Sequence, residues 1–387
     1  MKKICVITGT RAEYGLLKPL LTKINHAEKI ELLLVVTGMH LAPEFGLTYQ
    51  EIEKDGFQIT ERNEMLLSSD TPNGITKSIG LGIIGFADIY TRIIPDLVIV
   101  LGDRYEIYAA AIAALIHKIP IAHIHGGELT QGAIDDAIRH AITKMSSLHF
   151  TATEEYRHRV IQMGEDPRQV FCVGGLGVEN IKNQELLEKN ELEQSINFPL
   201  DKPYIIVTYH PVTLENNTAE EQFKNLLCAL DRFCEYRIIF TKANADTEGR
   251  IINQQIDAYT VSHPGRTIAF ASMGSVRYLS ALKYCEMVVG NSSSGILEAP
   301  SFHIPTVNIG DRQAGRVKAG SVIDCGNAAD DIWKAINQAI MVKASGKIKG
   351  VRNPYEGKNT SSVILSVIMQ YLDHEARIKK SFHDIDF

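Results

Sequence analysis

The sequence lacks an excess of basic residues, and this argues against nucleic-acid and anionic-membrane partners. Its 387 residues include 40 Lys and Arg against 46 Asp and Glu, a formal net charge of −6. Proteins that bind phosphate backbones or acidic lipid surfaces usually concentrate positive charge. An anionic small ligand remains compatible with this balance, because it needs only a few local donors.

Cysteine is also sparse, with six residues and no C-x-x-C pair. Disulfide frameworks and zinc sites both need cysteines at characteristic short spacings. We therefore interpret the scattered cysteines as buried, reduced thiols of a cytoplasmic protein. A structural zinc site is not expected, and the sequence indicates no metal or redox cofactor.

Long apolar runs are missing as well. The most apolar segment, residues 107–124, is interrupted by two histidines, a lysine and a proline, whereas a membrane-spanning helix needs about 20 mostly apolar residues. After Met1-Lys2-Lys3 the chain enters a strand-like segment and reaches Arg11 soon afterwards, which does not fit a signal peptide. We expect a cytoplasmic protein without a membrane partner.

The sequence instead alternates short β-branched runs with amphipathic helical patterns, and it does so twice. Strands are predicted at 4–8, 30–37, 97–101, 121–124, 149–153 and 170–173, and again at 204–208, 237–241, 267–271, 287–289 and 306–309. Strands separated by helices favour right-handed crossovers and a parallel sheet covered on both faces. A polar stretch from about Asn180 to Lys202 separates the halves. The prediction is an α/β protein with two Rossmann-like domains facing an interdomain cleft.

Ligands of such sheets bind beyond the carboxyl ends of the strands, where this sequence places its polar loops. Gly9–Gly15 follows the first strand and opens a helix, so its N–H groups and Arg11 suit an anion. The loop matches neither the dinucleotide nor the P-loop fingerprint, because Leu16 stands where the latter needs Lys. A plain strand-to-helix turn with a solvated arginine fits equally well.

Carboxylates and histidines follow the next strands. Asp103 is either a catalytic carboxylate or the N-cap of the following helix. His125 and Glu128 crowd one glycine-containing turn, and without H-E-x-x-H spacing we favour catalysis or hydrogen bonding over a metal. Asp135 and Asp136 begin a helix, either as a cap and surface pair or as a poised acid and base.

The second half repeats this arrangement. His210 is presented at a strand end by Pro211, although a lone histidine is more often structural. The segment Gly290–Gly295 contains three serines and suits an anion, with Glu298 placed for ribose hydroxyls; a serine-rich helix cap is the alternative. Arg312 follows the last of these strands and either closes over a phosphate or sugar or belongs to a charged surface turn.

Eight ordered motifs carry a resemblance to a known family. They are G-T-R-A-E-Y-G, V-T-G-M-H, L-G-D-R-Y-E, H-I-H-G-G-E, D-D-A-I-R-H, Y-H-P-V-T, G-N-S-S-S-G and N-I-G-D-R-Q-A-G-R, running from Lys3 to about Arg316. The set resembles the hydrolysing UDP-N-acetylglucosamine 2-epimerases of bacterial sialic-acid synthesis. N-P-Y near Asn353 and the last helix also fit, so nearly the whole chain is covered.

The resemblance implies a GT-B fold with domains at 1–180 and 181–359 and a final helix at about 360–387 packing back on the first. It implies a UDP-linked N-acetylamino sugar as substrate, bound through UDP mainly to the second domain, and a homo-oligomer, dimer or tetramer. The substrate-binding residues carried over are Arg11, Ala12, His40, Arg104, Asn244, Ser292, Ser293, Glu298 and Arg312. The catalytic candidates carried over are Asp103, Asp135, His125, Glu128 and His210.

The implied reaction has two steps. A base removes the proton at carbon 2 while UDP leaves anti, and water then adds to carbon 1 of the 2-acetamidoglucal as carbon 2 is reprotonated from the other face. Some family members carry Glu where this chain has His125, so His125 or Glu128 would take that acid/base role. From UDP-N-acetylglucosamine the product would be N-acetylmannosamine.

Other functions stay open at this point. The same reaction on UDP-N,N′-diacetylbacillosamine, for legionaminic acid, fits the same motifs. A GT-B glycosyltransferase would need an acceptor, and a non-hydrolysing epimerase would return a UDP-linked product. A nucleotide-sugar sensor is disfavoured by the intact Asp103, Asp135 and His210.

Overall fold

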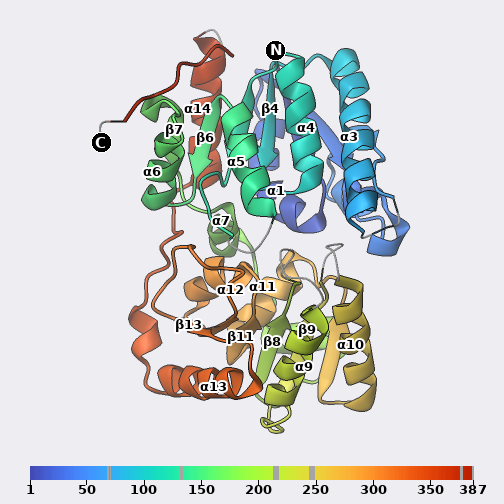
Figure 1. Ribbon diagram of the computed structural model, residues 1–387, viewed down its shortest axis with the longest axis vertical. Helices are drawn as coiled ribbons and strands as arrows, with labels where there is room; N and C mark the ends of the chain where they lie inside the picture. The colour runs from blue at the N-terminus through green and yellow to red at the C-terminus, as the bar shows by residue number, and fades with distance from the viewer. Residues whose placement is uncertain are drawn as a thin grey trace. The chain divides into compact units, whose positions relative to one another are not determined.

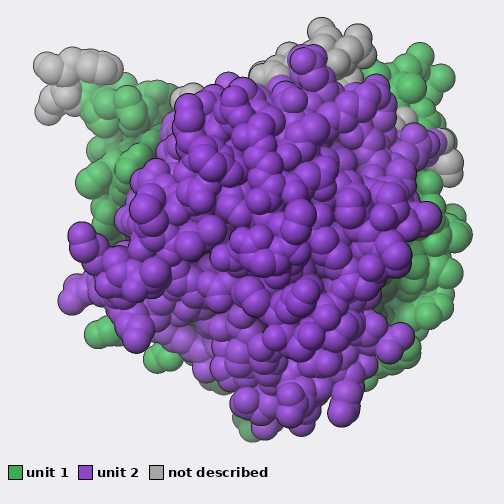
Figure 2. All heavy atoms as spheres, turned by 90° about the horizontal axis from the view of Figure 1, so that it is seen from below, with its two compact units in different colours: residues 1–128, 134–180, 355–387 green, residues 129–133, 181–354 purple. Residues whose placement is uncertain are grey.

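Two parallel sheets organise the chain in the computed structural model (Figure 1). The structure describes residues 1–67, 69, 71–130, 134–211, 218–243, 249–374 and 378–385. It divides into two compact units, coloured separately in Figure 2. Unit 1 comprises Met1–Glu128, Ile134–Asn180 and Tyr355–Phe387, and unit 2 comprises Leu129–Ala133 and Ile181–Pro354.

Unit 1 contains a seven-stranded sheet in the order β3-β2-β1-β4-β5-β6-β7, with every neighbouring pair parallel. The strands are β1 (Lys2–Thr8), β2 (Ile30–Thr37), β3 (Ile59–Asn63), β4 (Leu97–Leu101), β5 (Ile121–Ile124), β6 (Leu148–Thr151) and β7 (Val170–Cys172). The helices are α1 (Arg11–Asn25), α2 (Tyr49–Lys54), α3 (Pro72–Ile93), α4 (Tyr105–Ile116), α5 (Asp135–Met145), α6 (Glu154–Gln162) and α14 (Thr360–Asp373). One more helix, α7 (Leu176–Asn183), begins in unit 1 and ends in unit 2.

Both faces of this sheet are covered, and the alternation along β1 shows how. Ile4 and Val6 enter a core shared with α1 and α14, whereas Cys5 and Ile7 enter a core shared with α3 and α4. Figure 1 shows α3, α4 and α5 side by side over one face. Burial on both faces explains why these strands are continuously apolar rather than alternating.

Unit 2 contains a six-stranded parallel sheet in the order β10-β9-β8-β11-β12-β13. Its strands are β8 (Tyr204–Thr208), β9 (Arg237–Thr241), β10 (Thr267–Phe270), β11 (Met287–Gly290), β12 (Thr306–Ile309) and β13 (Val322–Cys325). Its helices are α8 (Lys189–Ile196), α9 (Ala219–Leu230), α10 (Gly249–Ser262), α11 (Ser275–Tyr284), α12 (Ser294–Leu297) and α13 (Ala329–Ala344). The two cores of unit 2 lie against α9, α10 and α13 on one face and α8 and α11 on the other.

The two strand orders follow the same rule. In each sheet the first strand, β1 or β8, lies in the interior. The next two strands are added on one side of it, and the strands from β4 or β11 onward are added on the other side. The crevice between the two central strands is the topological switch point, where ligands of open parallel sheets bind. In unit 1 it lies between the ends of β1 and β4, and in unit 2 between the ends of β8 and β11.

The prediction that the cysteines are buried is only partly confirmed. Cys5 and Cys285 are buried as predicted, but Cys172, Cys228 and Cys234 are exposed. All six are free thiols. In the parts of the chain that the structure describes, no helix is both long and apolar enough to cross a membrane.

Candidate functional site

The loop after β1 is held by a carboxylate of its own. Thr10 caps α1, and Glu13 forms a capping box by accepting the N–H groups of Gly9 (2.7 Å) and Thr10 (3.2 Å). Burial raises the pKa of Glu13 to about 8, with Arg104 opposing and Glu106 adding to the rise. The N–H groups of Gly9 and Thr10 are therefore bonded to Glu13, and the anion site predicted at the start of α1 stays a prediction. Arg11 pairs with Glu51 at 2.7 Å, and Ala12 is exposed.

His40 lies beneath this loop and is completely buried. Its Nε2 is 3.0 Å from the Thr8 hydroxyl and its Nδ1 is 2.8 Å from that of Thr48. Burial lowers the pKa of His40 to about 4, so the ring is neutral at physiological pH. In this conformation both ring nitrogens contact threonine hydroxyls, and the predicted contact of His40 with the sugar stays a prediction.

Asp103, at the end of β4, is bound to a buried arginine. Arg139 on α5 is only 2% exposed, and its Nη2 contacts Asp103 Oδ2. Its Nη1 donates to the Glu128 carbonyl at 2.9 Å and reaches Asp136 Oδ1 at 3.5 Å. The Arg139 guanidinium thus contacts the end of β4, the loop after β5 and the first turn of α5, which are three separate motifs in the sequence. Asp103 is not the cap of α4, because Arg104 occupies that position.

His125 and Glu128 lie together at the end of β5. His125 Nδ1 is 3.4 Å from Glu128 Oε1, and both residues are buried. His125 has a φ of 65°, a left-handed conformation that is uncommon for a residue with a side chain and often marks a functional turn. Asp135 and Asp136 occupy the first turn of α5, as predicted, and His140 lies 3.5 Å from Asp136.

Arg104 pairs with a carboxylate beside it in the sequence. Its Nε and Nη2 donate to the two oxygens of Glu106, at 3.2 and 3.1 Å. Glu106 is completely buried and also lies against Gly38, where a Cβ would be 2.9 Å from its Oε1. Glu106 therefore orients Arg104 and excludes any larger residue at position 38.

In unit 2, Asn291 connects the loops that follow β8, β11 and β12. Its side chain bonds both backbone groups of His210, and its own carbonyl accepts Gln313 Nε2 (2.8 Å) and Arg312 Nη1 (3.2 Å). Gly290 precedes it with a φ of 139°, where a Cβ would lie 1.9 Å from the Thr208 carbonyl. Only glycine fits there, so the β11 loop crosses close over β8.

The serine loop continues into α12 and presents Glu298. Tyr278 Oη is 2.6 Å from Ser294 Oγ, and the Ser294 hydroxyl donates to Glu298 Oε2. Burial raises the pKa of Glu298, while the Ser294 bond lowers it. Ser292 and Ser293 are half-buried, with Ser293 at the N-cap position of α12. Tyr278, Ser294 and Glu298 form a chain that fixes the carboxylate predicted to hold ribose.

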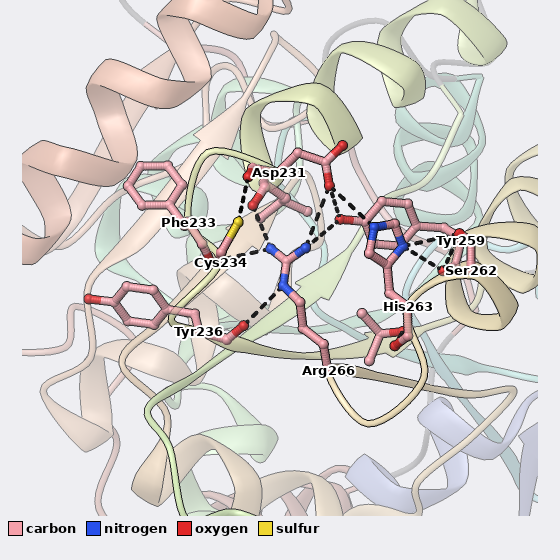
Figure 3. Close-up of polar contacts among 10 residues, drawn as sticks. Asp231, Phe233, Cys234, Tyr236, Tyr259, Ser262, His263 and Arg266 are labelled. Carbon is pink, nitrogen blue, oxygen red and sulfur yellow. Dashed lines mark hydrogen bonds and ion pairs between the residues drawn. The ribbon is translucent and has the colours of Figure 1, made fainter.

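A second polar cluster in unit 2 lies at the opposite ends of the strands. Arg266 and Tyr236 immediately precede β10 and β9. Figure 3 shows the Arg266 guanidinium among Asp231, Tyr259 and backbone carbonyls, with His263 stacked on Tyr259 at 4.1 Å between ring centroids. Arg266 donates to the carbonyls of Leu230, Phe233 and Tyr236. These contacts close the C-terminus of α9 and stabilise the fold, away from the switch point.

The structure thus gathers some of the predicted residues into one group in each unit, whereas Arg11, His40 and Arg104 contact other residues. Unit 1 brings together Asp103, His125, Glu128 and Asp136 around Arg139, and unit 2 brings His210, Arg312 and the serine loop together around Asn291. Asn244 lies outside the described residues. Within the described ranges, no group of three or more His, Cys, Asp or Glu is arranged to hold a metal ion.

Sequence reasoning missed the residues that hold these groups, chiefly Glu13, Glu106, Arg139, Tyr278 and Asn291. All but Tyr278 lie inside a motif that was recognised. The contact of Arg139 with Asp103 spans 36 positions and left no local signal. Asn291 stands in the serine-rich loop, but nothing local in the sequence indicates its bonds to His210, 81 positions away.

Comparison with known proteins identifies the family. A family model described as UDP-N-acetylglucosamine 2-epimerase matches residues 22–369. The GDP/UDP-N,N′-diacetylbacillosamine 2-epimerase (hydrolyzing) of Campylobacter jejuni is 44% identical over 84% of both chains. Polysialic acid biosynthesis protein P7 of Escherichia coli is 40% identical over 100% of this chain and 98% of that one. The UDP-N,N′-diacetylbacillosamine 2-epimerase (hydrolyzing) of Legionella pneumophila is 37% identical over 88% and 89%.

Solved structures agree on the fold. The MnaA–UDP co-structure from S. aureus gives a TM-score of 0.80 at 20% identity, covering 99% of this chain and 100% of that one. UDP-GlcNAc 2-epimerase of Neisseria meningitidis bound to UDP-GlcNAc gives 0.78 at 20% identity, covering 96% and 100%. The fold is α/β of the GT-B type, with two Rossmann-like units.

The chain therefore belongs to the UDP-N-acetylglucosamine 2-epimerase family. It is an enzyme of the UDP-sugar 2-epimerase kind, and two of its relatives are named as hydrolysing. The resemblance drawn from the eight motifs is confirmed.

Proposed function

We propose that the chain hydrolyses UDP-N-acetylglucosamine to N-acetylmannosamine and UDP, inverting carbon 2. The observation that carries this proposal is the position of Arg139, which contacts Asp103, Asp136 and the Glu128 carbonyl. These contacts bring Asp103 and Asp136 to the turn that carries His125 and Glu128, at the carboxyl end of the sheet. In the proposed reaction, a proton leaves one face of carbon 2 and another returns to the opposite face. Such chemistry needs a base and an acid of different character in one place.

In the proposed reaction, a carboxylate of unit 1 accepts the carbon 2 proton as the bond from carbon 1 to UDP breaks. The electron pair of the C–H bond forms the carbon 1–carbon 2 double bond, and UDP leaves with the pair of the C–O bond. A second group then protonates carbon 2 from the opposite face, and water adds its hydroxyl to carbon 1 and gives up its proton to a base of the site. We assign these proton transfers to Asp103, Asp135 and the His125–Glu128 pair, with His210 at the sugar end.

UDP recognition is proposed for the serine loop and its neighbours. Ser292 and Ser293 would donate to phosphate oxygens, and Glu298 would accept ribose hydroxyls, held in place by Ser294. Arg312, anchored on the Asn291 carbonyl, would approach the diphosphate as it acquires charge on leaving. Donors fixed in advance at a developing charge stabilise the transition state without reorganisation.

A second candidate substrate is UDP-N,N′-diacetylbacillosamine. It is favoured by the names of two similar relatives, the Campylobacter jejuni and Legionella pneumophila proteins, at 44% and 37% identity. The pathway named for the Escherichia coli relative supports the first candidate. The reaction and the proposed proton transfers are the same for both sugars.

Proton NMR of the purified protein with each UDP-sugar in deuterated water tests the proposal. Free 2-epimerised sugar carrying deuterium at carbon 2, together with UDP, is expected without acceptor or added metal. Turnover of only the diacetylated sugar would move the assignment to the second candidate. A UDP-linked epimer would instead indicate a non-hydrolysing enzyme, and an absolute need for an acceptor would indicate a glycosyltransferase.

Two further properties stay predictions. A homo-oligomer, dimer or tetramer, is proposed from the family resemblance, and light scattering of the purified protein would contradict it by giving a monomeric mass. Action in the cytoplasm likewise stays a prediction from the sequence.

A further inference from the structure

The backbone immediately before Asp103 is held from two sides. The Gly102 N–H donates to the Ile124 carbonyl at 3.0 Å, and the Gly102 carbonyl lies 2.8 Å from His123 Nε2. Gly102 has a φ of 77°, a turn that favours glycine. Its carbonyl shares one rigid peptide plane with the N–H of Asp103. Holding that oxygen therefore fixes the direction in which the Asp103 side chain leaves the backbone.

His123 is suited to this task because its neighbours select one tautomer. Burial lowers the pKa of His123 to about 3, against the opposing effect of the Gly102 contact, so the ring is neutral. A neutral imidazole carries one N–H, and a carbonyl can only accept, so the proton lies on Nε2. Nδ1 then accepts from the Thr143 hydroxyl, 3.1 Å away on α5.

The same side chain also supports the loop after β5. A Cβ on Gly126 would lie 3.1 Å from His123 Nδ1 and 3.0 Å from Thr143 Oγ1, so the backbone of this loop rests on the pair. His123 thus contacts the segment before Asp103, the segment between His125 and Glu128, and the helix that carries Arg139. Arg139 fixes the carboxylate of Asp103 from one side, and His123 fixes its backbone from the other.

We propose that His123 is a positioning residue for catalysis, which holds the Gly102–Asp103 peptide, and through it the Asp103 carboxylate, in the orientation that the reaction requires. This inference rests on the proposed function, in which Asp103 takes part in proton transfer at carbon 2. His123 itself touches neither substrate nor reacting atoms in this assignment.

Two variants at this position separate positioning from simple packing. His123→Gln keeps an amide N–H able to reach the Gly102 carbonyl, whereas His123→Leu has comparable bulk and no donor. We expect His123→Leu to lower kcat by about 10²-fold, the loss that a misplacement of about 1 Å produces, with KM for the UDP-sugar and Kd for UDP unchanged. His123→Gln should recover most of the lost rate. Thr143→Val, which removes the donor to Nδ1, should lower kcat less than His123→Leu does.

His149→Gln is the matched control. His149 is equally buried, pairs in register with His123 on the neighbouring strand, and bonds Glu165 rather than a site loop. It should lose thermal stability without losing kcat. Wild-type kcat in folded His123→Leu overturns the inference, and so does an equal loss of kcat in His123→Gln and His149→Gln. An inactive wild-type protein that binds UDP would overturn the proposed function itself, and with it the role of Asp103 that His123 serves.

Discussion

The side-chain amide of Asn291 pairs with both backbone groups of His210 across the switch point of unit 2. Asn291 Oδ1 accepts the His210 N–H and Asn291 Nδ2 donates to the His210 carbonyl, each at 2.7 Å. Because Asn291 is completely buried, neither bond is exchanged for water. The amide therefore fixes the backbone of the residue that the family resemblance places at the sugar.

Replacing Asn291 with Asp should separate this role from simple packing. The acceptor for the His210 N–H remains, but the donor is lost and a carboxylate oxygen faces the His210 carbonyl. We expect kcat to fall by about 10²-fold through misplacement of His210, measured by UDP release. Asn308→Asp is the control, because Asn308 is equally buried but bonds Asp324. If the Asn308 variant lost as much kcat, the effect would be general destabilisation of unit 2.

Arg139→Lys tests the guanidinium that joins three segments of unit 1. A single ammonium cannot contact Asp103, Asp136 and the Glu128 carbonyl together, since it lacks the planar fork of arginine. We expect kcat to fall and the free energy of unfolding to drop by about 1–3 kcal/mol, because buried acceptors lose a hydrogen-bond donor while the positive charge remains. Urea unfolding and steady-state kinetics measure the two effects. Arg157→Lys, which disturbs contacts with the Val170 and Pro167 carbonyls, should leave kcat unchanged.

The strands could be predicted because burial on both faces leaves a local signature of β-branched residues. Ile30–Thr37, Leu97–Leu101, Ile121–Ile124 and Tyr204–Thr208 were predicted with their observed bounds. β3 (Ile59–Asn63) escaped because it is an edge strand with charged residues, and β13 (Val322–Cys325) is a similarly half-exposed edge strand.

The position of the candidate site could be predicted from the sequence, but the contacts that orient its residues could not. The polar residues at strand ends were recognised, because a parallel sheet places them on one edge. The partners that orient them are set by tertiary contacts: Asp103 meets Arg139 only because β4 and α5 come together, and Asn291 lies 81 positions from His210. The capping box of Glu13 is visible in the sequence as T-R-A-E, but the additional bond from the Gly9 N–H to Glu13 depends on how the loop folds.

Asp103→Asn and Asp135→Asn test the proposed proton transfers directly. An amide cannot accept the carbon 2 proton, so each variant should lower kcat by at least about 10²-fold, the lower range for general acid–base catalysis. UDP should still bind, because its proposed contacts belong to unit 2, and titration calorimetry with UDP measures this. Near wild-type turnover in either variant would remove that residue from the mechanism. Asp166→Asn, which alters a local pair with Arg168, is the control.

Arg266→Ala tests the separation of stability from activity in unit 2. The change leaves the carbonyls of Leu230, Phe233 and Tyr236 without their guanidinium donor, which should cost about 1–3 kcal/mol. Neither kcat nor UDP affinity should change, because these contacts lie at the amino ends of β9 and β10. Arg232→Ala removes an exposed pair with Asp330 and a contact with the Trp333 ring, and it should cost about 1 kcal/mol. A loss of UDP affinity in Arg266→Ala would contradict a purely structural role.

The buried carboxylate of Glu165 should govern part of the acid stability of unit 1. Burial alone would raise its pKa, but hydrogen bonds from His149, Lys144 and Lys380 outweigh this and lower it to about 2, from an ordinary value of 4.5. A lowered pKa means that the unfolded chain takes up the proton first as pH falls. The stabilisation by Glu165 is therefore complete above about pH 4.5 and fades between pH 4.5 and 2.

Urea unfolding of the wild type and Glu165→Gln across this range measures the effect. The variant should be clearly less stable at pH 7, and the difference should shrink steadily below pH 4.5 as the wild-type carboxylate loses its advantage. Glu155→Gln is the control, because its pair with Arg159 is exposed and should contribute little at any pH. A stability difference that stays constant from pH 7 to pH 3 would mean that Glu165 contributes by packing, and that its three donors do not stabilise its charge.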